Sequence, residues 1–331
     1  MDDRKPPWSR RRFLGSVTGA ATVGLVGRPP EPDAAEPPPE TTTLTVGRYE
    51  SVCIAPTAVA EELLRAEGFT DVKYVSGDYP WGGVNLEMAF SGPTIMHIEA
   101  GDPILMIAGI HVGCFELHGT ERVRSVRDLK GKRVAVRSLG GGHHTFISAM
   151  AAHVGVNPTR DINWVILPPA EAKLQLADGK VDAYLGFPPD PQELRAKNVG
   201  HVIVNSNVDR PWSQYFCCTL NANRDFVKRQ PVATKRVLRA ILKATDLCAS
   251  DPERVADLLI AKGYTTQRHY ALQALKAIPF NRWREYDPED TVRFYALRLH
   301  EAGMVKSSPQ KIIALGTDWR FLNELKKELK G

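Results

Sequence analysis

The sequence predicts a two-lobed α/β fold with a cleft between the lobes and a helical C-terminal segment. Short apolar strands alternate with amphipathic helices from residue 43 to residue 204, a pattern typical of parallel sheets covered by helices on both faces. From residue 224 onward nearly every segment has helical periodicity. At 331 residues the chain is long enough for two lobes that each bury a core.

Each expected element rests on its apolar periodicity and on its flanking residues. Two of the C-terminal helices begin at an Asp-Pro pair, at Asp251 and at Asp287, where the acid can cap the helix and the proline suits its first turn. We expect strands at residues 44–46, 72–75, 104–110, 114–117, 133–136, 163–167, 183–186 and 201–204. We expect helices at residues 56–66, 143–153, 170–177, 190–196, 232–249 and 318–330.

The order of these elements predicts that the chain passes from one lobe to the other twice. We expect residues 41–117 and 213–331 to form lobe 1 and residues 118–212 to form lobe 2. Ligands of open α/β sheets bind beyond the carboxyl ends of the strands. The cleft between the lobes is therefore the predicted ligand site.

Residues 1–40 read as an export signal followed by a proline-rich linker. The run SRRRFLG at residues 9–15 is a twin-arginine motif, and a glycine- and alanine-rich apolar stretch follows it. The cleavage site is expected between Gly27 and Glu40. We therefore expect export of the folded protein to the periplasm; the alternative interpretation is a disordered basic tail.

Charge and cysteine content exclude several classes of function. The net charge of +5 is dispersed, without the basic stripe and interleaved aromatics of a nucleic-acid-binding protein. The five cysteines stand at positions 53, 114, 217, 218 and 248. We interpret them as small core residues rather than as disulfides, redox groups or metal ligands, and expect neither a metal nor a cofactor.

A glycine loop after the strand at residues 133–136 is the strongest candidate for ligand binding. It opens a helix whose free N–H groups and partial positive charge suit a sulfonate, carboxylate or phosphate. Neighbouring helical residues diverge by about 100°, so only one of two adjacent histidines can face the cleft, and His144 is preferred. A flexible turn is the alternative interpretation of the loop. The candidates here are Ser138, Gly141, Gly142, His143, His144 and Thr145.

Further candidates follow other strands or lie at the presumed hinge. Aromatic residues among them favour a ligand with an organic body. Trp81 is equally compatible with surface packing, and Trp212 with bracing of the hinge, while Asp190 is interpreted as the cap of the next helix. These further candidates are Ser51, Cys53, Trp81, Ser91, Thr94, Phe187 and Trp212.

Two segments of lobe 2 carry a family resemblance. The run DLKGKRVAV at residues 128–136, with ADGKVDA at residues 177–183, resembles the type II periplasmic binding proteins of ABC importers. Within them the chain is most similar to the group of nitrate, sulfonate, taurine and thiamine-pyrimidine-precursor binders, over about residues 43–265.

The resemblance implies a monomeric receptor that closes on a small organic, anionic or heteroaromatic solute and then docks to an ABC permease, with no enzymatic step. Sulfonates, carboxylates and pyrimidine-like solutes all remain candidates. The same group includes a eukaryotic pyrimidine synthase. The enzymatic alternative is therefore pyrimidine-precursor chemistry with His143 or His144.

Overall fold

The structure is a computed structural model that describes residues 36–76 and 83–329. The described residues from Pro38 onward belong to one compact unit. The twin-arginine motif lies outside the described residues. Within the described ranges no helix has both the length and the apolar character needed to cross a membrane.

The first sheet, in lobe 1, has the strand order β2-β1-β3-β10-β4. Strand β10 runs antiparallel to both β3 and β4, whereas β1 pairs in parallel with β2 and β3. All nine residues of β4 are buried, although it is the last strand in this order. The strands are β1 (Thr43–Arg48), β2 (Asp71–Ser76), β3 (Leu86–Phe90), β4 (Ile104–Val112) and β10 (Phe216–Asn223).

The second sheet, in lobe 2, has the order β7-β6-β8-β5-β9. Its strands are β5 (Glu116–Gly119), β6 (Arg133–Val136), β7 (Asn163–Ile166), β8 (Ala183–Gly186) and β9 (His201–Asn205). Strand β5 is antiparallel to β8 and β9. The prediction of parallel sheets is therefore wrong for β5 and β10, because these strands carry the chain into lobe 2 and back and run against their neighbours.

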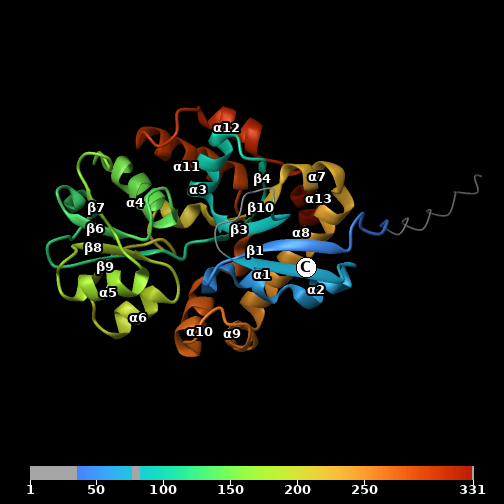
Figure 1. Cartoon of the computed structure of the whole chain (residues 1–331), viewed down its shortest axis with the longest axis horizontal. Helices are drawn as coiled ribbons and strands as arrows, with labels where there is room; N and C mark the ends of the chain where they lie inside the picture. The colour runs from blue at the N-terminus through green and yellow to red at the C-terminus, as the bar shows by residue number, and fades with distance from the viewer. Residues whose placement is uncertain (1–35, 77–82, 330–331) are drawn as a thin grey trace, which may run out of the picture. The chain divides into compact units, whose positions relative to one another are not determined.

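The helices cover both faces of each sheet (Figure 1). In lobe 2, α4 lies over one face and α5 and α6 over the other. The helices are α1 (Ala55–Val59), α2 (Glu61–Ala66), α3 (Ser91–Ala100), α4 (Gly142–His153), α5 (Pro169–Ala177), α6 (Asp190–Ala196), α7 (Arg224–Arg229), α8 (Pro231–Ser250), α9 (Pro252–Ala261), α10 (Arg268–Ala277), α11 (Pro288–Glu301), α12 (Pro309–Gly316) and α13 (Arg320–Glu328). Short 3-10 turns lie at η2 (Val52–Ile54), η3 (Val126–Leu129), η4 (Trp212–Gln214) and η5 (Phe280–Arg282).

The predicted helix caps are mostly found. The side chain of Asp251 accepts a hydrogen bond from the Arg254 N–H at 3.2 Å, and Asp287 caps α11 in the same way. Asp190 differs, because the N-cap of α6 is Pro189. The Asp190 carboxylate instead accepts hydrogen bonds from Lys173 at 2.8 Å and from the Tyr184 hydroxyl at 2.6 Å.

The chain moves from the first sheet to the second over residues 113–115 and returns over residues 206–215. Hydrogen bonds also join the lobes away from these connections. The backbone N–H of Val52 and the hydroxyl of Ser51 each donate to the Pro188 carbonyl at 3.2 Å. The segment that follows β1 is thereby tied to the segment that follows β8.

Candidate ligand-binding site

The N-terminus of α4 is built by the glycine loop as the sequence suggests. Gly140 has a positive φ of 79°, and a Cβ at Gly141 would lie 2.6 Å from the Ser138 Oγ, so both positions suit glycine. The Thr145 hydroxyl donates to the carbonyls of Gly141 and Gly142 at 3.1 and 3.2 Å. Ser138 is exposed beside the loop, whereas Thr145 is buried within it.

The N-terminus of α3 in lobe 1 lies against that of α4 in lobe 2. A Cβ placed on Gly92 would approach the Thr145 Oγ1 to 3.0 Å. The Ser91 hydroxyl contacts two backbone carbonyls of β10 at 3.3 Å, and the Thr94 hydroxyl donates to the Phe90 carbonyl at 3.1 Å. The hydroxyls of Ser91 and Thr94 therefore hold α3 on its sheet in this structure.

His143 lies in the first turn of α4, beside the segment that follows β8. Its side chain is buried, and its ring stacks on Phe187 with centroids 4.0 Å apart. Burial, together with the positive charge of Arg137, lowers the pKa of His143 to about 3. In this environment the imidazole of His143 is neutral at neutral pH.

His144 has a different role from the one preferred on sequence grounds. Its Nδ1 accepts a hydrogen bond from the backbone N–H of Gly140 at 3.0 Å, and its ring meets Trp164 edge-on at 4.6 Å. Burial lowers the pKa of this histidine as well. His143, and not His144, is the histidine beside Phe187.

An aromatic cluster fills the region between the two helix N-termini. Phe115, in the connection between the sheets, lies 4.8 Å from Phe187, 4.8 Å from Phe146 and 5.1 Å from Phe90, measured between ring centroids. Tyr295 of α11 meets Phe90 at 5.1 Å.

The structure bears on the two interpretations of Trp212 but not on those of Trp81. Trp212 is buried, and its ring meets Phe146, His153 and Phe294 edge-on at 5.3 to 5.6 Å. These contacts join α4 of lobe 2 to α11 and correspond to the bracing interpretation. Trp81 lies outside the described residues.

Cys53 belongs to a buried group that sequence reasoning did not bring together. The side chains of His111, Cys114 and Cys218 surround it, and Cys217 is adjacent. Hydrogen bonds from the thiols of Cys114, Cys217 and Cys53 outweigh burial and lower the pKa of Cys218 well below its usual range. The H-x-x-C spacing at residues 111–114 and the Cys-Cys pair at residues 217–218 are the sequence signals that point to this group.

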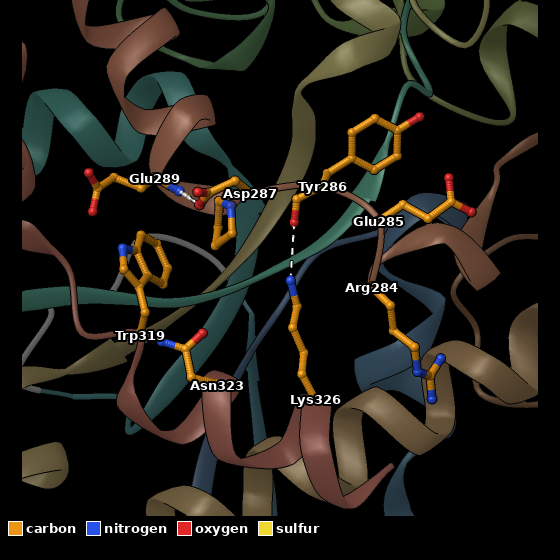
Figure 2. Close-up of a pocket in the computed structure, with 9 residues that line it drawn as sticks. Arg284, Glu285, Tyr286, Asp287, Glu289, Trp319, Asn323 and Lys326 are labelled. Carbon is orange, nitrogen blue, oxygen red and sulfur yellow. Dashed lines mark hydrogen bonds between the residues drawn. The ribbon is translucent and has the colours of Figure 1, made fainter. Parts of the chain in front are cut away.

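A surface hollow of about 380 Å³ lies elsewhere, between the loop before α11 and the last helix (Figure 2). Lys326 donates to the Tyr286 carbonyl across it at 3.2 Å, and Asp287 accepts the Glu289 N–H at 2.8 Å. Its polar groups thus hold α11 and α13 in place. The hollow is lined by Arg284, Glu285, Tyr286, Asp287, Pro288, Glu289, Trp319, Asn323 and Lys326.

Part of the chain matches a known family and a curated relative. Residues 117–261 match the NMT1-like family. The nitrate/nitrite binding protein NrtA of Nostoc sp. is 21% identical over 248 residues, which cover 65% of this chain and 56% of that protein. The match thus spans little more than half the length of that relative.

Two solved structures are similar to the whole unit. The alkanesulfonate-binding protein SsuA from Xanthomonas axonopodis pv. citri, bound to MOPS, has a TM-score of 0.63 at 19% identity, over 83% of this chain and 96% of that one. The desulfurization enzyme DSZB has a TM-score of 0.61 at 14% identity, over 86% and 99%. The resemblance is confirmed at the level of the fold: the described chain has the two-lobed α/β fold of the alkanesulfonate-binding protein, and its residues 117–261 match the NMT1-like family.

Proposed function

We propose that this chain is the periplasmic solute-binding component of an ABC importer. It closes its two lobes on a small organic solute, and the closed form docks to a permease in the inner membrane. The observation that carries the proposal is the approach of α3 and α4, one from each lobe, end to end at Gly92 and Thr145. Separation of the lobes would expose both helix N-termini to the same solute.

The proposed solute is anionic or heteroaromatic: a sulfonate, a carboxylate or a pyrimidine-like compound. Free N–H groups at two helix N-termini favour negative charge. The neighbouring rings of Phe187, Phe115 and Phe90 favour an organic body over a bare inorganic anion. The similarity to nitrate- and alkanesulfonate-binding proteins supports an anionic solute.

The cellular setting belongs to the same proposal. The twin-arginine motif at residues 9–15 supports export, and the dispersed charge supports a function without nucleic acid. A monomer is what the family resemblance implies. An enzyme on the same fold is the alternative, and the likeness to the desulfurization enzyme DSZB is the observation that favours it. Cys53 and His111, buried close together, would be its first candidates.

A thermal-shift screen of the full chain tests the proposal. Its panel contains sulfonates, carboxylates, nitrate and pyrimidines. A ligand at 100 times its Kd stabilises the folded state by about 2.7 kcal/mol, which the screen detects. We expect a hit whose shift is lost in Phe187→Ala and kept in His300→Ala, because His300 is exposed on α11. Absence of any hit, or equal loss in both variants, would contradict the assignment of the site.

A further inference from the structure

Three cysteines and one histidine converge in the core of lobe 1. Cys53 lies in η2 after β1, His111 near the end of β4, Cys114 in the connection to lobe 2, and Cys218 on β10. One ligand atom from each lies within 4.8 Å of all the others, and all four side chains are at least nine-tenths buried. The cysteines are free and buried in the core, as expected, and three of them also share one cluster with His111.

The spacing is close to that of a tetrahedral metal site. With metal–sulfur bonds of about 2.3 Å, two sulfurs of a zinc tetrahedron lie about 3.8 Å apart. The longest separation in the cluster, up to 4.8 Å, exceeds this edge by about 1 Å. Side-chain rotation in a set of three thiols and one imidazole can close that difference without rearrangement of the strands.

The backbone around the cluster is irregular where the ligands are. His111 and Cys218 are direct partners in the β4–β10 ladder, and the register shifts on both sides of Cys218. Cys114 has a φ of 111°, a left-handed conformation that non-glycine residues rarely adopt. Such irregularities are typical of functional sites, because they aim particular side chains at the cost of local strain.

The surroundings supply the outer contacts that metal ligands need. The two ring nitrogens of His111 lie 3.1 Å from the Cys53 carbonyl and 3.2 Å from the Val112 carbonyl. Each ring nitrogen therefore faces a carbonyl, and His111 would have to give up one of these contacts by rotating its ring to bind a metal, while the other nitrogen keeps an outer hydrogen bond. The Ser51 hydroxyl lies 3.1 Å from the Cys53 sulfur. Its single proton goes to the Pro188 carbonyl in this structure and would turn to the sulfur once metal binding makes Cys53 a thiolate.

We propose that Cys53, His111, Cys114 and Cys218 bind one zinc-class divalent ion. Three thiolates and one imidazole are the donor set of tetrahedral zinc, and four protein ligands make a closed, structural site. The ion would join η2, β4, β10 and the lobe connection at one point. Because Ser51 also contacts the Pro188 carbonyl of lobe 2, the site lies directly beneath a contact between the lobes.

A disulfide between Cys114 and Cys217 is the alternative to metal binding. Its sulfur lies 3.1 Å from that of Cys114, so oxidation could join these two thiols and remove one ligand from the cluster. Two electrons and two protons would then pass to an external oxidant. A count of free thiols in denaturant distinguishes the states, because a chain with the intact cluster has five free thiols and a chain with the Cys114–Cys217 disulfide has three.

The test is a titration of the reduced, metal-free full chain with Co²⁺ under anaerobic conditions, followed by Zn²⁺. We expect one Co²⁺ per chain, with thiolate charge-transfer absorption and the intense visible bands of a tetrahedral site, and displacement by Zn²⁺. Cys218→Ser should abolish these bands. Cys248→Ser is the matched control, because Cys248 is equally buried but lies in α8 outside the cluster.

A second variant keeps the proposal testable if Cys218→Ser fails to fold. Ser51→Ala removes no ligand and should weaken Zn²⁺ binding by about 10- to 100-fold, the usual effect of losing an outer contact. Reduced wild-type protein that gives no thiolate–Co²⁺ absorption would overturn the proposal. So would freshly isolated protein with only three free thiols in denaturant, or bands that disappear in Cys248→Ser.

Discussion

The buried histidine at the start of α4 makes stability depend on pH in a calculable way. The pKa of His143 falls from 6.5 to about 3 on folding, because burial and the charge of Arg137 disfavour the imidazolium. The unfolded chain therefore binds the proton more readily. The contribution of His143 is fully present above pH 6.5 and is lost as the pH falls toward 3.

The magnitude follows from the shift. Each pH unit below the unfolded pKa removes about 1.4 kcal/mol, so about 2.7 kcal/mol is lost two units below it. His143→Phe keeps an aromatic ring against Phe187 and removes the titration. We expect the unfolding free energy of wild type, measured by urea denaturation, to fall by this amount relative to the variant between neutral pH and that point.

Other titrating groups are common to both proteins and cancel in this difference. His300→Phe is the control, because His300 is exposed on α11 and meets solvent in both states. Parallel pH profiles of wild type and His143→Phe would refute the reasoning, since they would mean that His143 is protonated equally in the folded and unfolded chain.

Two further predictions concern the cores of the lobes. Gly109→Ala should lower the free energy of unfolding by about 1–3 kcal/mol, because its Cβ would lie 2.2 Å from the Phe216 ring, and an unchanged urea midpoint would contradict this packing. Glu116→Gln should lower the unfolding free energy by about 3 kcal/mol at neutral pH, because Glu116 is buried and pairs with His118 and Arg195. Burial alone would raise the pKa of Glu116, but the hydrogen bonds and charges of these two partners outweigh burial, so the pKa is lowered on folding. The stability advantage of wild type over Glu116→Gln should therefore disappear as the pH falls below the ordinary glutamate range. An advantage that persists in acid would refute the pairing.

Local patterns predicted the short strands and long helices of the fold well. The strands expected at residues 133–136 and 183–186 coincide with β6 and β8, and the long C-terminal helix coincides with α8 to within one residue at each end. Each of these has a continuous apolar run or a clear helical periodicity between turn signals. Such signals lie within the segment itself and need no knowledge of distant partners.

Strand β10 escaped prediction for a physical reason. Its residues Thr219 and Asn221 are fully buried, although their side chains are polar. The Thr219 hydroxyl donates to the side-chain Oδ1 of Asn221 at 2.9 Å, and the Asn221 side-chain amide donates to the Thr94 hydroxyl of α3 at 3.1 Å. The sequence alone does not reveal partners so far apart, and the strand therefore does not read as a core strand.

Distance along the sequence also limited which site residues could be predicted. The glycine loop and its two histidines could be proposed as a candidate site because their signals lie within a few residues of one another. The approach of Cys53, His111 and Cys218 depends on the register between β4 and β10 and on the position of η2. Only the H-x-x-C spacing at residues 111–114 is local, and three residues of spacing are too weak to predict a metal site.

The central claim is that the chain binds a solute between its lobes and releases it unchanged. The most direct measurement incubates the full chain with the best ligand of the screen and analyses protein-bound and free ligand by mass spectrometry. The account predicts one intact ligand per chain, recovered in full after denaturation. A ligand that is converted in amounts exceeding the protein would contradict it and establish an enzyme on this fold.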